Sequence, residues 1–126
     1  MLAAFAATLV TFLALDAVWL KFFVGPFFRA QVPDLLAEDP RLDVAALFYV
    51  GYCAGIVWFA VRPGIEGGLA AAALNGALLG LMAYGCYEFT NMATLKGWTW
   101  RMVALDVSWG TALTAVSAVA GAWAAR

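Results

Sequence analysis

Three carboxylates stand inside long apolar stretches of the chain: Asp16, Glu88 and Asp106. In a hydrocarbon environment a mid-helix Asp costs about 2.5 to 3.5 kcal/mol on insertion scales, so each such acid needs a partner or a purpose. Carboxylates in this setting bind protons, pair with cationic ligands or act as general acids and bases. Their positions therefore mark a candidate functional site.

The first and last of these acids share a local pattern, Asp16-x-x-Trp19 and Asp106-x-x-Trp109, with Asp and Trp on one helical face. If the two helices run in opposite directions, each Trp can reach the Asp of the other helix. Because a buried indole N–H needs an acceptor, we predict reciprocal hydrogen bonds, Trp19 to Asp106 and Trp109 to Asp16. Two interpretations stay open. One is a structural clasp, and the other is a ligand- or proton-binding role, since neutral groups would make a clasp at lower cost.

A further polar group is formed by Tyr84, Tyr87, Glu88 and Asn91, at positions i, i+3, i+4 and i+7. This spacing places them on one face of a helix that is otherwise rich in Ala, Leu and Gly. A solvated helix end could explain Asn91 alone, but it would not require two tyrosines and a carboxylate one turn deeper. Arg101 could neutralise Glu88 or extend toward lipid phosphates, and the second arrangement is the one we expect.

The composition excludes several other kinds of chemistry. With 66% hydrophobic and 12% charged residues, the chain lies outside the range of soluble domains. Seven Lys and Arg against eight acids leave no basic excess, so no nucleic-acid partner is expected. The chain has no histidine, and Cys53 and Cys86 are expected to be buried, inert thiols, so no metal or other cofactor is expected. A hard cation held by the acids and Asn91 is a weaker alternative, because Lys96 and Arg101 lie nearby.

Four segments are long and apolar enough, or nearly so, to cross the hydrocarbon, which needs about 20 residues. They cover residues 2–24, 44–61, 69–91 and 100–123. We therefore predict an all-α fold: one integral-membrane domain that is an antiparallel four-helix bundle. The first segment lacks a basic n-region and a cleavage pattern, so we expect it to persist as a helix.

The stretch between the first two spans is predicted to be a short interfacial segment, divided by Pro33. It alternates apolar and polar side chains: Phe27, Phe28, Val32, Leu35 and Leu36 with Arg29, Gln31, Asp34 and Glu38. Breaks between the helices are predicted at Gly25-Pro26, Arg62-Pro63-Gly64 and Lys96-Gly97. Asp43 is predicted to be the N-cap of the second helix.

Small residues mark faces on which helices could approach closely in lipid. Gly51-x3-Gly55 on the second span and Ala72-x3-Gly76-x3-Gly80 on the third could form one such contact with each other. Trp98, Trp100 and Trp123 are predicted to belong to the aromatic belt at the membrane surface.

Antiparallel crossings bring the polar residues to one half of the membrane. The end of the first span, the start of the second, the end of the third and the start of the fourth share a membrane face. These ends supply the residues predicted to bind a ligand or protons: Asp16, Trp19, Tyr49, Tyr84, Tyr87, Glu88, Asn91, Asp106 and Trp109.

The basic residues predict which face that is. The connections on the side of the acids carry Lys21, Arg29, Arg41, Lys96 and Arg101, whereas the other side carries Arg62 and Arg126. Cytoplasmic loops carry the excess of Lys and Arg, so we expect both termini outside and the two longer connections in the cytoplasm.

The motifs also resemble those of a known family. They are Leu15-Asp16-x-x-Trp19-Leu20, Phe48-Tyr49, Tyr87-Glu88-Phe89-Thr90-Asn91-x-Ala93-Thr94-Leu95-Lys96-x-Trp98 and Asp106-x-x-Trp109-Gly110. They resemble an uncharacterised family of small bacterial four-helix membrane proteins, a domain of unknown function. Two positions depart from that family: Glu88 replaces the usual Asp, and Phe89 replaces a common Leu. The resemblance implies an inner-membrane protein with these positions functional, and it implies no reaction.

Three functions stay open. The first is a protein that binds, and in one version transports, a small cationic or lipid-like ligand; by analogy with small multidrug transporters this version implies a homodimer. The second is an intramembrane enzyme acting on a lipid or isoprenoid, with one of the acids as general acid or base. The third is an interaction subunit of a larger membrane complex. Membrane lipids are expected partners in all three.

Overall fold

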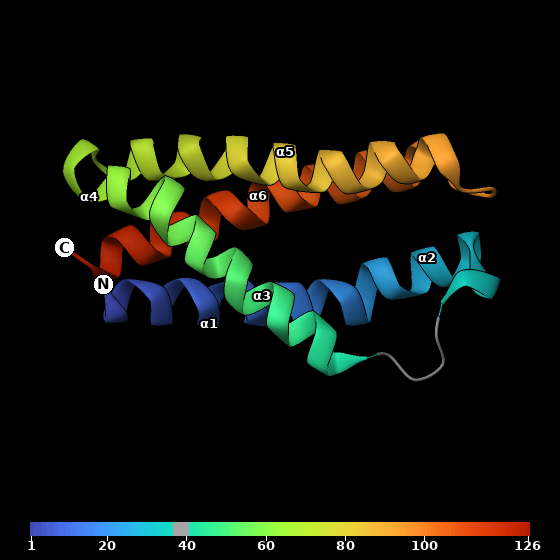
Figure 1. Ribbon diagram of the computed structural model, residues 1–126, viewed down its shortest axis with the longest axis horizontal. Helices are drawn as coiled ribbons and strands as arrows, with labels where there is room; N and C mark the ends of the chain where they lie inside the picture. The colour runs from blue at the N-terminus through green and yellow to red at the C-terminus, as the bar shows by residue number, and fades with distance from the viewer. Residues whose placement is uncertain (37–40) are drawn as a thin grey trace.

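The computed structural model describes residues 1–36 and 41–126, so Glu38 of the predicted interfacial segment lies outside the described residues. Within the described residues, four helical rods contain candidate membrane spans, which are long and apolar enough to cross a membrane: Leu2–Phe23, Leu42–Gly67, Leu69–Thr94 and Trp100–Ala124. They run in alternating directions, and both termini lie at the same end (Figure 1). The predicted all-α, antiparallel four-helix bundle is confirmed.

The first rod continues as a helix beyond its candidate span and beyond the predicted end at residue 24. It comprises α1 (Leu2–Trp19), the π-helical turn η1 (Leu20–Val24) and α2 (Gly25–Gln31). The predicted break at Gly25-Pro26 is wrong, because Gly25 has helical dihedral angles (φ −55°, ψ −56°) and the wider π-helical turn comes directly before the proline. A Cβ at Gly25 would overlap the carbonyl oxygen of Leu20, so the turn requires glycine. After α2, Val32 is not helical, and Pro33–Leu35 form a short 3-10 helix, so the chain does divide at Pro33.

The second rod also passes through its predicted break. It comprises α3 (Leu42–Ile56), the π-helical turn η3 (Val57–Val61) and α4 (Arg62–Gly67). Pro63 sits in the first turn of α4, where its missing N–H does least harm, and the chain turns instead at Gly68, with φ +96°. Arg41 occupies the N-cap position, so Asp43 lies in the first turn of α3 and is not the cap.

Helices α5 (Leu69–Thr94) and α6 (Trp100–Ala124) are joined by a turn at the predicted Lys96-Gly97. Gly97 has φ +80°, which favours glycine. Thr99 then starts α6, because its hydroxyl accepts a hydrogen bond from the Met102 backbone N–H at 3.3 Å.

Gly76 and Gly80 of α5 pack against α6 and not against α3, whereas Ala72 of α5 packs against Gly64 of the second rod. A Cβ at Gly76 would lie 2.9 Å from Ala115 Cα, and one at Gly80 would overlap the Gly110 carbonyl oxygen. Around Gly51 and Gly55 there is open space for a Cβ. The suggested contact between the glycines of the second and third spans is therefore wrong, because these α5 glycines are occupied by the backbone of α6.

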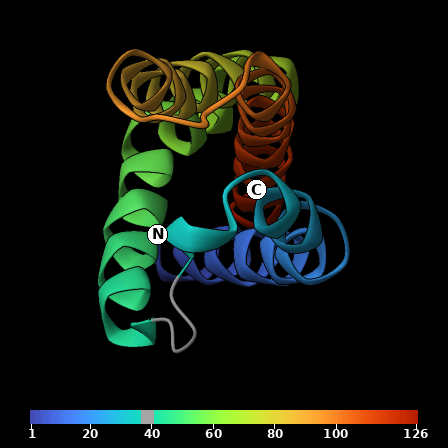
Figure 2. The same cartoon turned by 90° about the vertical axis from the view of Figure 1, so that its right-hand side faces the viewer.

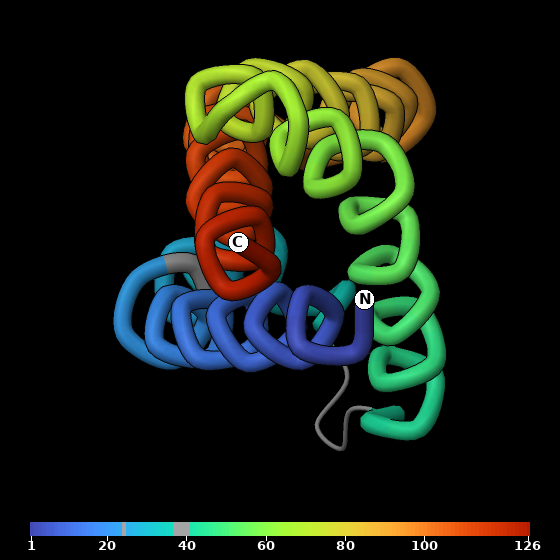
Figure 3. The backbone as a smooth tube through the Cα atoms, turned by 90° about the vertical axis from the view of Figure 1, so that its left-hand side faces the viewer, coloured from blue at the N-terminus to red at the C-terminus, as the bar shows by residue number. Residues whose placement is uncertain are grey.

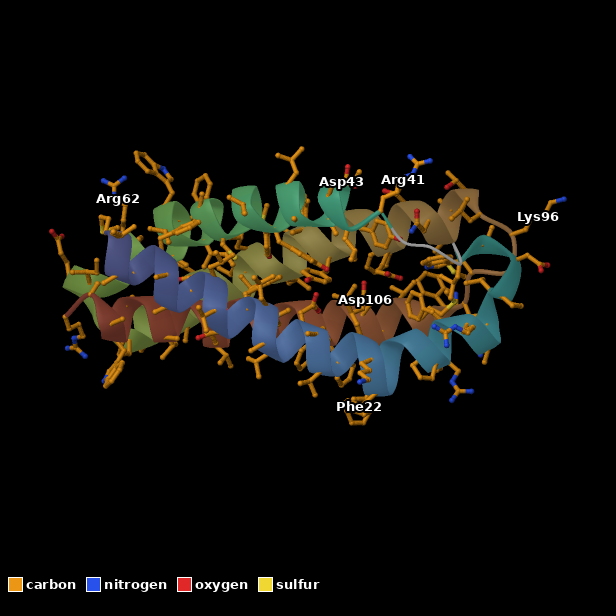
Figure 4. The ribbon with its side chains drawn as sticks, turned by 90° about the horizontal axis from the view of Figure 1, so that it is seen from below. Phe22, Arg41, Asp43, Arg62, Lys96 and Asp106 are labelled. Carbon is orange, nitrogen blue, oxygen red and sulfur yellow. The ribbon has the colours of Figure 1, made fainter. Side chains whose placement is uncertain are left out.

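Seen end-on, the four rods form the sides of a four-sided bundle, in the order α1, α3, α5, α6 (Figures 2 and 3). Helix α6 packs along both α5 and α1, whereas α5 meets the second rod mainly through η3 and α4. Helix α3 slants away from α5 and toward α1 (Figure 1). Arg41 and Lys96 lie at one end of the bundle and Arg62 at the other (Figure 4). Which end faces the cytoplasm stays a prediction.

The close contact of α5 with α6 can be tested with two matched glycine substitutions. Gly80→Ala should lower the free energy of unfolding by about 1 to 3 kcal/mol, because the added methyl group has no room at Gly110. Gly51→Ala is the control, since both glycines are helical and only the free space differs. Unfolding in mixed detergent micelles measures both, and equal midpoints for the two variants would contradict the packing described here.

Candidate functional site

Asp16 joins three of the four rods. It is 5% exposed on α1, and its two oxygens accept separate hydrogen bonds. The Tyr49 hydroxyl of α3 donates to Oδ2 at 2.9 Å, and the Trp109 indole of α6 donates to Oδ1 at 3.3 Å. The predicted bond from Trp109 to Asp16 is therefore present, and Tyr49 is a second donor that the Asp-Trp pattern alone did not indicate.

The other half of the predicted reciprocal pair does not form. Trp19 stacks on Trp109 with ring centroids 4.4 Å apart and planes 9° from parallel, and on Phe23 at 5.1 Å. Its buried Nε1 has no acceptor among the described residues. The prediction of a Trp19–Asp106 bond is wrong. It required each indole to extend to the Asp of the opposite helix, but the two indoles stack face to face.

Glu88 lies on the side of α5 that faces α6. The buried positions of α5 are Ala72, Gly76, Gly80 and Glu88, all on one four-residue repeat. Tyr84 fills the remaining position of that repeat, and its ring lies on Gly110 of α6. The line of small residues thus continues into the predicted polar face, and the Glu88 side chain becomes completely buried.

Trp98 is the hydrogen-bond donor to Glu88. The chain folds back after Gly97, and the Trp98 indole donates to Glu88 Oε1 at 2.9 Å. Its ring also stands edge-on to Phe28 and Tyr87, with centroids 5.6 and 6.2 Å away. Trp98 is therefore not a simple surface-belt residue as predicted. The turn at Gly97, which returns the chain toward the end of α5, was the signal in the sequence that Trp98 could reach this helix.

The second carboxyl oxygen of Glu88, Oε2, does not share the bond to Trp98. Oε2 is buried and no donor among the described residues reaches it. The carboxyl group of Asp106 on α6 is a neighbour of Glu88, with Asp16 a weaker neighbour. Arg101 does not neutralise this pair: it is exposed, and its guanidinium lies 5.9 Å from the centre of the Phe27 ring. Two carboxyl groups thus face each other without a cation between them.

Asp106 faces a cavity of about 490 Å³. Its side chain points from α6 into the space between the helices (Figure 4). The cavity lies between the first half of α3, the second half of α5 and α6, and its lining is Ala45, Phe48, Tyr49, Tyr52, Ala83, Tyr84, Tyr87 and Asp106. Five aromatic rings and one carboxyl group therefore make up most of the wall.

The predicted site residues fall into three groups around this cavity. Tyr49, Tyr84, Tyr87 and Asp106 line it. Asp16, Trp19 and Trp109 lie behind Tyr49 on the α1 and α6 side. Glu88 lies behind Asp106, and Asn91 is half-buried one turn nearer the end of α5.

Four lining residues were not among the predicted site residues: Ala45, Phe48, Tyr52 and Ala83. Tyr52 shares a 2.8 Å hydrogen bond with Thr114 of α6, and its ring stacks on that of Phe48 at 5.6 Å. Their spacing from Tyr49, by one and three residues, places all three near one face of α3, which was the available signal. Of the two cysteines, Cys53 is buried as predicted, but Cys86 is exposed, because it lies on the side of α5 turned away from α6.

The three intramembrane acids do not converge on one point. Among the described residues, no three His, Cys, Asp or Glu side chains come close enough together to hold a metal ion. The acids are instead arranged as a single carboxylate with two donors, Asp16, and a pair, Glu88 and Asp106. Only Asp106 lines the cavity.

Similarity to known proteins was found at the level of a family. A family model described as "Predicted membrane protein (DUF2177)" matches residues 1–123. Neither a curated protein nor a solved structure matches the chain.

The role of Asp16 as a shared acceptor predicts a graded response to substitution. Asp16→Leu should cost about 1 to 3 kcal/mol of unfolding free energy, because it leaves the Tyr49 and Trp109 donors unpaired. Asp16→Asn should cost less, since one acceptor oxygen remains. The control is Asp43→Leu at the exposed start of α3. If Asp16→Leu unfolds at the same detergent fraction as wild type, the carboxylate does not hold the three helices together.

The bond between Trp98 and Glu88 predicts coupling between the two positions. Trp98→Phe keeps an aromatic ring but leaves both oxygens of a buried carboxyl without a donor. Adding Glu88→Met should then cost less than it does in wild type, with a coupling energy of about 0.5 to 3 kcal/mol in a double-mutant cycle. Additive effects of the two substitutions would show that the bond contributes nothing to stability.

Proposed function

Because the chain belongs to the DUF2177 family of predicted membrane proteins, we propose a membrane function for its cavity: it binds a small organic cation, with Asp106 as the counter-charge. The observation that carries this proposal is the composition of the cavity wall. Phe48, Tyr49, Tyr52, Tyr84 and Tyr87 supply aromatic surface, and Asp106 supplies the only carboxyl group on the described wall.

Aromatic rings and a carboxylate together favour a cation. The face of each ring carries negative electrostatic potential, and a desolvated cation gains about 2 kcal/mol or more from such a contact. An anionic ligand would meet both the ring faces and Asp106 unfavourably. No Lys or Arg is among the described residues that line the cavity, so the wall offers an anion no compensating charge.

The neighbouring groups support the availability of Asp106. Asp16 is already bonded to Tyr49 and Trp109, and Glu88 is bonded to Trp98 and completely buried. The Asp106 carboxyl has Glu88 as its hydrogen-bonding neighbour on one side and lines the cavity on the other. A bound cation would place positive charge beside Asp106 and Glu88, where two carboxyl groups now face each other.

The volume fits the same proposal. Sites for small molecules commonly measure about 300 to 1,000 Å³, with mostly apolar walls and few polar groups that fix orientation. At about 490 Å³ the cavity falls within that range. The Tyr49 and Tyr52 hydroxyl groups are bonded to Asp16 and Thr114, and the four tyrosines add no charge to the wall.

Benzyltrimethylammonium, a quaternary ammonium ion with one ring, is a suitable probe. Titration calorimetry on the detergent-solubilised protein should detect binding, and Asp106→Asn should weaken it about 10- to 100-fold, as expected for loss of a charged contact. Asp43→Asn removes a carboxylate outside the cavity and serves as the control. Equal affinity in Asp106→Asn and Asp43→Asn would exclude Asp106 as the counter-charge, and no binding to wild type would exclude the proposal for this class of cation.

A further inference from the structure

The cavity at Asp106 has an exposed rim on two helices. Phe48 of α3 and Tyr87 of α5 both line it, yet they are 60% and 57% exposed. Deeper in the wall, Tyr49 and Tyr84 are only partly exposed. The cavity therefore opens on the flank of the bundle, between α3 and the second half of α5.

The slant of α3 explains this opening. Near Gly68 the second rod lies against α5, through η3 and α4. Toward its start, α3 crosses to α1 and moves away from α5 (Figures 1 and 3). The bond between Tyr49 and Asp16 fixes α3 on α1 at the level of the cavity. With α3 held there, its first half and the second half of α5 leave the flank open.

The nearby end of the bundle is covered. Trp98 stands edge-on to both Tyr87 and Phe28, so aromatic rings from α5, the turn and α2 meet at this end of the bundle. Beside them the Thr99 hydroxyl lies 3.4 Å from the side-chain oxygen of Gln31. The segment from α2 thus packs across the end, and the flank is the more open approach.

In a bilayer, the surface around the flank opening would contact lipid chains. Leu47 next to the rim of α3 is 77% exposed, and Met82 beside the lining residue Ala83 is 70% exposed. Asp106 lies about 9 Å along α6 from its start at Trp100, at 1.5 Å per residue. A cation held there would sit below the helix ends, and a chain attached to it could pass directly between α3 and α5 into the hydrocarbon.

From this geometry we propose that the ligand is a cationic amphiphile that enters sideways from the bilayer between α3 and α5. Its headgroup lies at Asp106 between the aromatic rings, and its long apolar chain remains among the lipid chains. This inference rests on the proposed function and adds the ligand class and the route.

Benzyldimethyldodecylammonium with a photoreactive diazirine at the end of the chain tests this inference in phosphatidylcholine nanodiscs. After irradiation, peptide mass spectrometry should find labels on the outward faces of residues 44–51 and 82–90. Labelling that persists in Asp106→Asn measures nonspecific contact and is subtracted. Ala45→Trp should weaken binding of this probe about tenfold or more by filling the opening, whereas the exposed neighbour Ala46→Trp should not.

Each outcome bears on a different part of the inference. Specific labels on residues 25–36 or 95–99 would show that the chain leaves through the end of the bundle and would overturn the sideways route. Binding of benzyltrimethylammonium without binding of the dodecyl probe would overturn the amphiphile and leave the proposed function in place. Absence of binding by both probes would overturn both.

Discussion

The close approach of α5 and α6 is the contact on which the rest of the structure depends. Helices in lipid gain little from the hydrophobic effect when they associate, so backbone contact through small residues supplies the attraction. Gly76 and Gly80 leave no room for a side chain against α6, and Gly110 leaves none against Tyr84. Glu88 continues the same line and is buried for that reason. The position of the polar face is therefore a consequence of glycine packing one to three turns away.

The second constraint is that a buried carboxylate needs a hydrogen-bond donor. In two places an indole N–H is that donor. Asp16 receives the N–H of Trp109, and Glu88 receives that of Trp98. An indole suits this role because it brings one donor and a large apolar surface, so that the acid gains a partner without adding charge to the interior. In each case the donor belongs to a different part of the chain from the acid, and the bond joins those parts.

Much of the fold could be predicted from the sequence because hydropathy and length determine which segments can span a bilayer. The positions at which helices end were harder to predict. Pro26 and Pro63 usually end helices, but here the π-helical turns before them let each rod continue, and the side-chain pattern contains no marker for such a turn. For the site, the alternating direction of the predicted helices was enough to place the three acids in the same half of the bundle. It could not show that α3 slants away from α5, because that depends on the fit of Tyr49 and Phe12 against one another and on the bond to Asp16. The cavity and the partner of Glu88 are products of that three-dimensional fit.

The stacking of Trp19 on Trp109 has a consequence for symmetry. Two copies of one Asp-x-x-Trp pattern on antiparallel helices could have satisfied each other completely, as a closed twofold arrangement with no group left over. The face-to-face stack breaks that equivalence, because only one indole can then reach an acid. Asp16 of the first copy accepts the bond from Trp109 of the second, whereas Asp106 of the second copy lies beside Glu88 and lines the cavity. The two acids of a repeated motif thus have different surroundings in the folded chain.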